Sequence, residues 1–303
     1  MATRTLGLGL AAVAFLWLVS GCQTEKANAI CRDADRKIVG YMLDVSRHRV
    51  PTMDTVKRQV DILASLGYNH FQLYTEHTFA YRGHESAWRE ASPFTPDEIR
   101  ELDDYCAERG IELVANQNSF GHLERWLKHP EYNDLAEAPQ GGTISGGKAY
   151  PFPASLCPTD PRCIGFLSGL YDQLLPCFRS KYLNVGGDET VELMDTGTPK
   201  IGRSAAEIEA KGAHRVYLEF LKKIHRLVRE RDHEMMFWGD IVLQKPELAA
   251  ELPKDLIALN WGYESDHPYA KETAALKKAG LRFIVCPGTS TWCSLLGRTD
   301  VMI

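Results

Sequence analysis

The sequence lacks the short signatures of several common protein classes. Its 303 residues contain no Cys-x-x-Cys pair and no His-Glu-x-x-His string, so it gives no support for a structural zinc site or a zinc-dependent peptidase. Basic residues do not cluster, and 35 Lys and Arg against 40 Asp and Glu give a net charge of −5. That balance argues against nucleic acid as a partner. We therefore expect neither a metal site nor a nucleic-acid surface.

A long apolar stretch is present only at the N-terminus, and it is too short for a comfortable bilayer span. Arg4 precedes the apolar residues 6–19, and Leu18-Val19-Ser20-Gly21-Cys22 ends the run. This layout is typical of a bacterial lipoprotein signal with Cys22 as the lipidated residue. An ordinary signal peptide with a chance cysteine is the alternative. Gln23, in place of aspartate, resembles the outer-membrane sorting pattern, so we expect a lipid-anchored protein of the bacterial cell envelope.

The remaining chain divides into a polar tether, residues 23–36, and a single folded domain, residues 37–303, after a signal peptide at 1–22. The domain is long enough for one α/β barrel. Eight cysteines include Cys22, which leaves an odd number for the rest of the chain. The close spacing of Cys157 and Cys163 permits a disulfide in an oxidising compartment, although sequence alone does not assign the pairing.

Short apolar runs alternate with segments of helical period, which is the pattern of βα units around a parallel sheet. We expect strands at 38–44, 70–74, 111–115, 182–185, 235–238, 257–261 and 282–286. Helices are expected at 53–66, 95–109, 164–178 and 204–231. Strands of this number with right-handed crossovers favour a (β/α)8 TIM barrel over an open sheet, which periodicity alone does not exclude. Since no eighth strand follows, we expect an α/β barrel truncated before its eighth βα unit.

Polar and aromatic residues gather where the predicted strands end, and this is where parallel α/β folds carry functional side chains. After the fourth strand, Gly186 and Gly187 free the backbone to turn, and Asp188 and Glu189 follow at once. A polar loop with a helix-capping acid explains that pair equally well in isolation. Other strand ends add Asp44, Arg47, Glu76, His77, residues 116–122, Trp238, Asp240, Trp261, Glu264 and Trp292. Tryptophans among acids and an arginine favour a sugar site, because rings stack on C–H faces and charged groups bind hydroxyls.

These residues resemble glycoside hydrolase family twenty, the β-N-acetylhexosaminidases, from about residue 40 to residue 300. The most specific match is Val185-Gly186-Gly187-Asp188-Glu189. Leu43-Asp44-Val45-Ser46-Arg47, Asn118-Ser119-Phe120-Gly121-His122 and Ser155-Leu156-Cys157-Pro158 support it. The resemblance implies hydrolysis of terminal, non-reducing β-linked N-acetylhexosamine (GlcNAc or GalNAc) without a cofactor. The implied mechanism is substrate-assisted and retaining, through an oxazolinium intermediate.

The resemblance also implies roles for individual residues. Glu189 would act as general acid and then base, and Asp188 would hold the acetamido N–H of the substrate. Arg47 would bind ring hydroxyls, and His122 would support the acid/base carboxyl, with Glu76 placed behind it. The pocket wall would come from the tryptophans Trp238, Trp261 and Trp292.

Two departures from the family pattern keep other functions open. Asn116 and Asn118 stand where most members carry acids, and the eighth strand, which in relatives adds an aromatic residue and an acid, is missing. The alternative is therefore a surface glycan-binding lipoprotein whose degenerate barrel has lost turnover. A barrel hydrolase for a sugar without the acetamide is a third hypothesis. The sequence leaves open the oligomeric state and the choice between gluco and galacto substrates.

Overall fold

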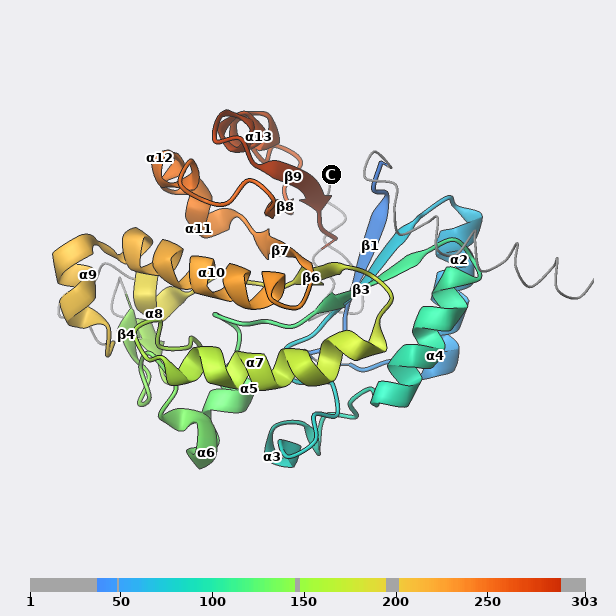
Figure 1. Ribbon diagram of the computed structural model, residues 1–303, viewed down its shortest axis with the longest axis horizontal. Helices are drawn as coiled ribbons and strands as arrows, with labels where there is room; N and C mark the ends of the chain where they lie inside the picture. The colour runs from blue at the N-terminus through green and yellow to red at the C-terminus, as the bar shows by residue number, and fades with distance from the viewer. Residues whose placement is uncertain (1–36, 48, 145–147, 195–201, 290–303) are drawn as a thin grey trace, which may run out of the picture.

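The computed structural model describes residues 37–47, 49–144, 148–194 and 202–289 (Figure 1). The predicted signal peptide with Cys22, the tether and Trp292 lie outside the described residues. Within the described part, no helix is both long and apolar enough to cross a membrane.

A parallel sheet forms the centre of the domain. Its strands are β1 (Gly40–Asp44), β2 (His70–Tyr74), β3 (Glu112–Asn116), β6 (Tyr182–Asn184), β7 (Glu234–Trp238), β8 (Ile257–Gly262) and β9 (Arg282–Pro287). They pair in the order β1-β2-β3-β6-β7-β8-β9, with β1 and β9 at the edges of a curled sheet (Figure 1). All seven predicted strands are confirmed, with every bound within two residues of its predicted position.

Helices cover the outer face of this sheet (Figure 1). The longer ones are α2 (Met53–Ser65), α4 (Pro96–Ala107), α7 (Arg162–Leu174), α9 (Ala205–Lys211), α10 (Ala213–Arg229) and α13 (Tyr269–Lys278). The start of α4 has a capping box: Thr95 accepts the Glu98 backbone N–H, while the Glu98 carboxylate accepts that of Thr95. This reciprocal pair satisfies two N–H groups that the helix leaves without partners.

Short elements in the loops complete the described fold. They are α3 (Glu85–Trp88), α5 (Glu124–Leu127), α6 (Pro130–Asn133), the 3-10 turn η2 (Leu175–Cys177), α8 (Val191–Met194), α11 (Asp240–Leu243), α12 (Pro246–Ala249) and the antiparallel pair β4 (Gly142–Ile144) and β5 (Lys148–Tyr150). The sequence did not predict these elements.

Two predicted helices were too long. The segment 204–231 forms α9 and α10, which are separated at Gly212, where φ is 84°. This left-handed conformation ends α9 and is readily adopted only by glycine. The segment 164–178 leaves the α-helix at Leu174, because Pro176 lacks the N–H that a longer helix needs.

The interior of the sheet contains both apolar and polar side chains. Trp238 packs in a small apolar cluster with Val114, Met236, Ile257 and Leu259. Next to Met236, the Gln72 amide bonds the His70 ring at 2.7 Å and accepts the Asn184 amide at 3.0 Å. Burial lowers the pKa of His70 to about 4, so this ring is neutral at neutral pH. The bonded polar groups connect β2 to β6 directly below the strand end that carries the acid pair.

The cysteines of the described residues are reduced. Cys157 and Cys163 are both free and buried, so the disulfide that their spacing permits is not formed. The Cys163 thiol instead donates to the Leu135 carbonyl, with an S···O distance of 3.4 Å. Burial raises the pKa of Cys163 to about 12, which keeps this thiol unreactive.

Candidate active site

The loop after β6 turns sharply before it reaches the two acids. Gly186 and Gly187 have φ of 68° and 94°, and Glu189 has φ of 46°. A Cβ atom at Gly186 would lie 2.0 Å from the Asn118 amide oxygen, so only glycine fits. A left-handed conformation at a non-glycine residue costs on the order of 1–3 kcal/mol. This turn allows neighbouring carboxyl groups, which would face opposite sides of a regular strand, to face the same site.

Both carboxyl groups converge on one histidine nitrogen. His122 Nε2 lies 3.2 Å from Oδ2 of Asp188 and 3.4 Å from Oε2 of Glu189. A Cβ atom at Gly121 would lie 2.3 Å from the Asp188 carbonyl oxygen, so the two backbone segments are in direct contact. Burial alone would lower the pKa of His122, but Asp188, Glu189 and Glu76 raise it well above its usual value. The imidazole is therefore a cation between carboxyl groups.

Glu76 lies on the other side of this imidazole. Its side chain is only 2% exposed, and its Oε1 atom is 3.8 Å from His122 Nδ1 and 3.2 Å from Arg47 Nε. The Tyr74 hydroxyl donates to the same oxygen at 3.2 Å. Burial raises the pKa of Glu76 to about 7 against the opposing effect of Arg47. Glu76 thus links the histidine to the arginine.

Arg47 is held by three neighbours and still reaches the surface. Its guanidinium lies 2.5 Å from the Asp44 carboxylate and 4.2 Å from the centre of the Tyr74 ring, in addition to its contact with Glu76. Its side chain is 26% exposed. A planar guanidinium fixed in this way has donors free for the hydroxyl groups of a ligand.

Aromatic residues line the same end of the sheet. The indole nitrogens of Trp238 and Trp261 are buried and have no hydrogen-bond partner among the described residues. The Trp261 ring lies 5.2 Å from that of Tyr263. Burial, and then the negative charges of Asp188 and Glu189, raise the pKa of Tyr263 to about 12, which places this phenol in the field of the acid pair. Tyr263 was not predicted as a site residue, since no motif in the sequence marks it and only the fold brings it near the acid pair.

Asn116 at the end of β3 and Asn118 in the loop after it depart from the acids of the family pattern, and the contacts of Asn116 explain why an amide stands there. Asn116 accepts the Thr75 backbone N–H at 2.6 Å and donates to the Asn184 carbonyl at 3.2 Å. A carboxylate could accept the first bond but could not donate the second. Asn116 therefore fastens β2 and β6 to β3, and the side chain of Asn118 packs below Gly186.

The structure thus brings together Asp188, Glu189, His122, Glu76 and Arg47 through successive contacts of 3.2–3.8 Å. Trp238 and Trp261 end neighbouring strands of the same sheet. Within the described ranges, no group of three or more His, Cys, Asp or Glu side chains is arranged to hold a metal ion. The arrangement provides an exposed carboxyl, a more buried one and a cation between them. These are the groups that acid–base chemistry on a sugar requires.

Comparison with known proteins supports the family resemblance of the sequence motifs. Residues 38–296 match the model of the glycosyl hydrolase family 20 catalytic domain. A beta-hexosaminidase of Vibrio furnissii is 25% identical over 296 residues, which cover 88% of this chain and 46% of that protein. A beta-hexosaminidase of Akkermansia muciniphila is 22% identical over 66% of this chain and 43% of its own length. The chain thus spans less than half the length of these curated relatives.

Solved structures show the same fold. A chitobiase from Flavobacterium johnsoniae superposes with a TM-score of 0.67 at 24% identity, covering 83% of this chain and 38% of that one. A β-N-acetylhexosaminidase from Bacteroides fragilis gives a TM-score of 0.65 at 22% identity, covering 84% of this chain and 51% of that one.

Proposed function

Since the chain belongs to glycosyl hydrolase family 20, we propose that it removes terminal, non-reducing β-linked N-acetylhexosamine residues from glycans. The observation that carries this proposal is the convergence of Asp188 and Glu189 on His122 Nε2, at 3.2 and 3.4 Å. Because one of the two carboxyl groups is buried and the other is exposed, they can perform different tasks on one bound sugar.

Glu189 is the proton donor in this proposal. Its side chain is 54% exposed, so its carboxyl can reach the glycosidic oxygen of a bound sugar. As that oxygen takes the Glu189 proton, the bond to the anomeric carbon breaks and the substrate's acetamido oxygen bonds to that carbon. Glu189 then removes a proton from water, which attacks the anomeric carbon and opens the oxazolinium ring. Two displacements retain the configuration, and neither needs a cofactor.

Asp188 holds the acetamido group during these steps. Its Oδ1 atom is buried and has no hydrogen-bond partner among the described residues, so it is an acceptor available to the amide N–H. The positive charge that grows on the acetamido group would be stabilised by this carboxylate more strongly than the neutral group is. Arg47 would bind ring hydroxyls, and Trp238 and Trp261 would enclose the sugar, with Trp292 closing the pocket.

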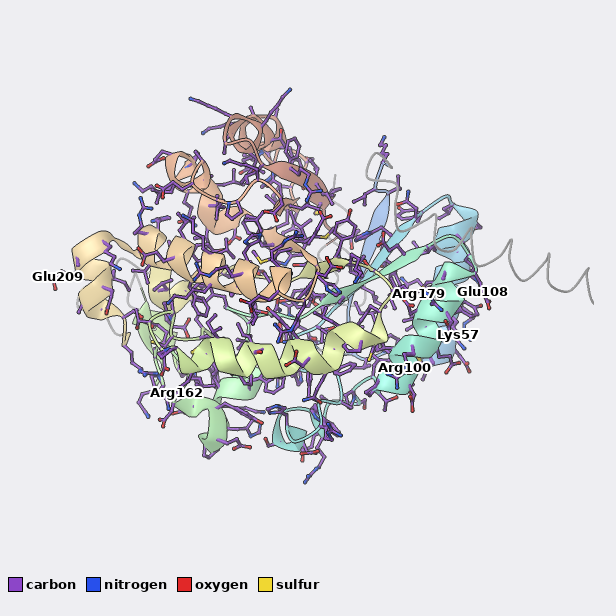
Figure 2. All side chains as sticks on the ribbon, in the orientation of Figure 1. Lys57, Arg100, Glu108, Arg162, Arg179 and Glu209 are labelled. Atoms are coloured by element: carbon purple, nitrogen blue, oxygen red, sulfur yellow. The ribbon has the colours of Figure 1, made fainter. Side chains whose placement is uncertain are left out.

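A direct test compares hydrolysis of two chromogenic substrates, 4-nitrophenyl β-N-acetylglucosaminide and 4-nitrophenyl β-glucoside. We expect nitrophenol release from the first only, since the second has no acetamide to attack. Glu189→Gln should lower kcat by roughly 1,000-fold or more, because the proton donor is lost. Glu209→Gln is the matched control: this acid lies on α9 at the edge of the molecule and points outward (Figure 2).

Three results would contradict the proposal. Equal cleavage of the plain glucoside would show that the acetamido group of the substrate takes no part in the reaction. Full activity in Glu189→Gln would show that Glu189 is not the proton donor. Calorimetric binding of N-acetylglucosamine without any hydrolysis would instead support a glycan-binding protein. The same assay with the galactosaminide substrate would determine the preferred sugar configuration.

We also propose that Cys22 carries a lipid anchor that holds the domain at the bacterial envelope, in the outer membrane. The charged, apolar and small-residue pattern of residues 4–22 supports this. Cys22→Ser should abolish incorporation of labelled palmitate and release the protein from the membrane fraction. Unchanged labelling in this variant would contradict the anchor.

We propose an eight-stranded (β/α)8 barrel in which a further strand lies between β1 and β9. These two strands are the edges of the described sheet, and Phe283 and Val285 on β9 are 36% and 42% exposed. A crystal structure of the full-length gene product should show a strand paired with both edges, and a different neighbour at either edge would contradict this.

A further inference from the structure

A third carboxyl group lies next to the acid pair. Asp240 begins α11 directly after β7, and its Oδ2 atom accepts the backbone N–H of Glu189 at 3.2 Å. Its position is fixed by the sheet: the Trp238 N–H donates to the Gly186 carbonyl at 2.9 Å, and the Gly239 N–H donates to the Leu259 carbonyl at 2.8 Å. Asp240 is therefore rigidly aimed at the turn that carries Glu189.

The direction of the Glu189 side chain depends on its backbone. The side chain is 54% exposed, and its ion-pair partner is His122. Its φ of 46° lies in the left-handed region, which is unfavourable for glutamate unless other contacts stabilise it. The Glu189 carbonyl accepts the Val191 N–H at 2.7 Å, and Asp240 holds the N–H. Both polar groups of this residue's backbone are thus engaged.

Other side chains hold the turn but do not contact the Glu189 backbone. Asn184 accepts the Gly186 N–H at 3.0 Å, and the Tyr217 hydroxyl donates to the Gly187 carbonyl at 2.9 Å. These contacts fix the two glycines. The contact from Asp240, in contrast, fixes the backbone of Glu189 itself.

We propose that Asp240 is a positioning residue, which accepts the Glu189 N–H and so maintains the left-handed turn that directs the Glu189 carboxyl at the substrate. This inference rests on the proposed function, because it assigns Asp240 to the same reaction. It goes further because the acid/base group then depends on Asp240, the first residue of α11, which follows the neighbouring strand β7.

The surroundings of Asp240 indicate that it does so as a neutral group. Burial, and then the negative charge of Asp188, raise its pKa to about 8. The hydrogen bond from the Glu189 backbone N–H opposes this rise, the charge of the Glu189 carboxyl adds to it, and the Tyr217 phenol lies in the same field. His122, the cation next to the acid pair, contacts Asp188 and Glu189. A neutral carboxyl still accepts the Glu189 N–H and adds no third negative charge beside the pair.

The test compares Asp240→Ala with Asp240→Asn. Asparagine keeps a neutral acceptor in the same place, whereas alanine removes it. We expect Asp240→Ala to lower kcat on the order of 100-fold with little change in KM, since a misdirected catalytic group costs about this much. Asp240→Asn should retain kcat within about threefold. Asp232→Ala, at the opposite end of β7 and 90% exposed in its side chain, is the matched control.

A second measurement does not depend on hydrolysis. Hydrogen exchange of the segment 185–194 should be faster in Asp240→Ala at the Glu189 amide and unchanged in Asp240→Asn. Wild-type kcat in Asp240→Ala, equal losses of kcat in both variants, or unchanged exchange in Asp240→Ala would overturn the inference. If the alanine variant does not fold, Asp240→Asn decides: a loss of kcat well beyond threefold, or faster exchange at its Glu189 amide, would overturn the inference. If the wild type hydrolyses nothing, the proposed function fails, and the exchange comparison still tests the Asp240 contact.

Discussion

The imidazole of His122 bridges Asp188 and Glu189, with Nε2 only 3.2 Å from the first carboxyl and 3.4 Å from the second. The ring itself sits on a left-handed residue, with φ of 56°. Two strained positions, His122 and Glu189, thus face each other across the site. Strain at such positions persists only where surrounding contacts hold it, and it is concentrated at functional sites.

Replacing the bridging histidine should impair turnover. In His122→Gln the cation between the two carboxyls is lost, and kcat/KM should fall by about 100-fold or more. His122 itself should give the wild-type pH profile no step near pH 6.5, the ordinary histidine pKa, because its raised pKa keeps it charged there. His214→Gln, on the exposed side of α10, serves as the control. An activity step near pH 6.5 that disappears in His122→Gln would contradict this role.

A single methyl group at Gly121 should disturb the acid pair. In Gly121→Ala the new Cβ would lie 2.3 Å from the Asp188 carbonyl oxygen, so one backbone must move. We expect a loss of about 1–3 kcal/mol in the free energy of unfolding, together with a loss of activity. Gly165→Ala, where a Cβ meets nothing within 4 Å on α7, should be neutral or slightly stabilising. Urea unfolding of both variants measures the difference, and equal stabilities would contradict the close approach.

Arg47 should not be replaceable by lysine. The guanidinium contacts Asp44 and Glu76 and lies over the Tyr74 ring, and an ammonium group cannot make all three contacts at once. Arg47→Lys should lower kcat/KM by roughly 10- to 100-fold, the cost of one or two charged hydrogen bonds. Arg215→Lys, on the surface pair with Glu251, is the control. If the kinetics of Arg47→Lys equalled those of the wild type, Arg47 would not be a substrate-binding residue.

Glu76 should make the stability of the protein fall with rising pH. Its folded pKa is raised from 4.5 to about 7, so the stability associated with its neutral form is fully present below pH 4.5 and is lost as pH rises through 7. Glu76→Gln has no such ionisation. The unfolding free energy of this variant, relative to the wild type, should therefore increase by up to about 3 kcal/mol between pH 4.5 and 8. Chemical denaturation at several pH values measures this, and parallel pH curves for the two proteins would contradict it.

Sequence periodicity was sufficient for the sheet because each strand is a short apolar run bounded by turn residues. It failed at Gly212, where good helix formers stand on both sides and only the φ of 84° reveals the break. It also failed for the short pair β4 and β5, whose three-residue strands carry no periodic signal. These features depend on tertiary contacts rather than on local propensity.

The candidate site shows the same division. The motif around Asp188 and Glu189 marked the acid pair, and residue type marked Arg47, His122 and the tryptophans. Sequence could not assign a task to Asp240, because its contact is with the backbone N–H of Glu189 in the loop after another strand, β6. It missed Tyr263 because proximity to the acids is a property of the folded sheet.

The proposed mechanism requires that Asp188 and Glu189 act on one sugar. The measurement that tests this most directly is a crystal structure with the thiazoline analogue of the cyclised N-acetylglucosamine intermediate. We predict that Asp188 lies within hydrogen-bond distance of the thiazoline nitrogen while the Glu189 carboxyl faces the anomeric carbon. A bound analogue that touches only one of these carboxyls, or that lies elsewhere on the protein, would contradict the account.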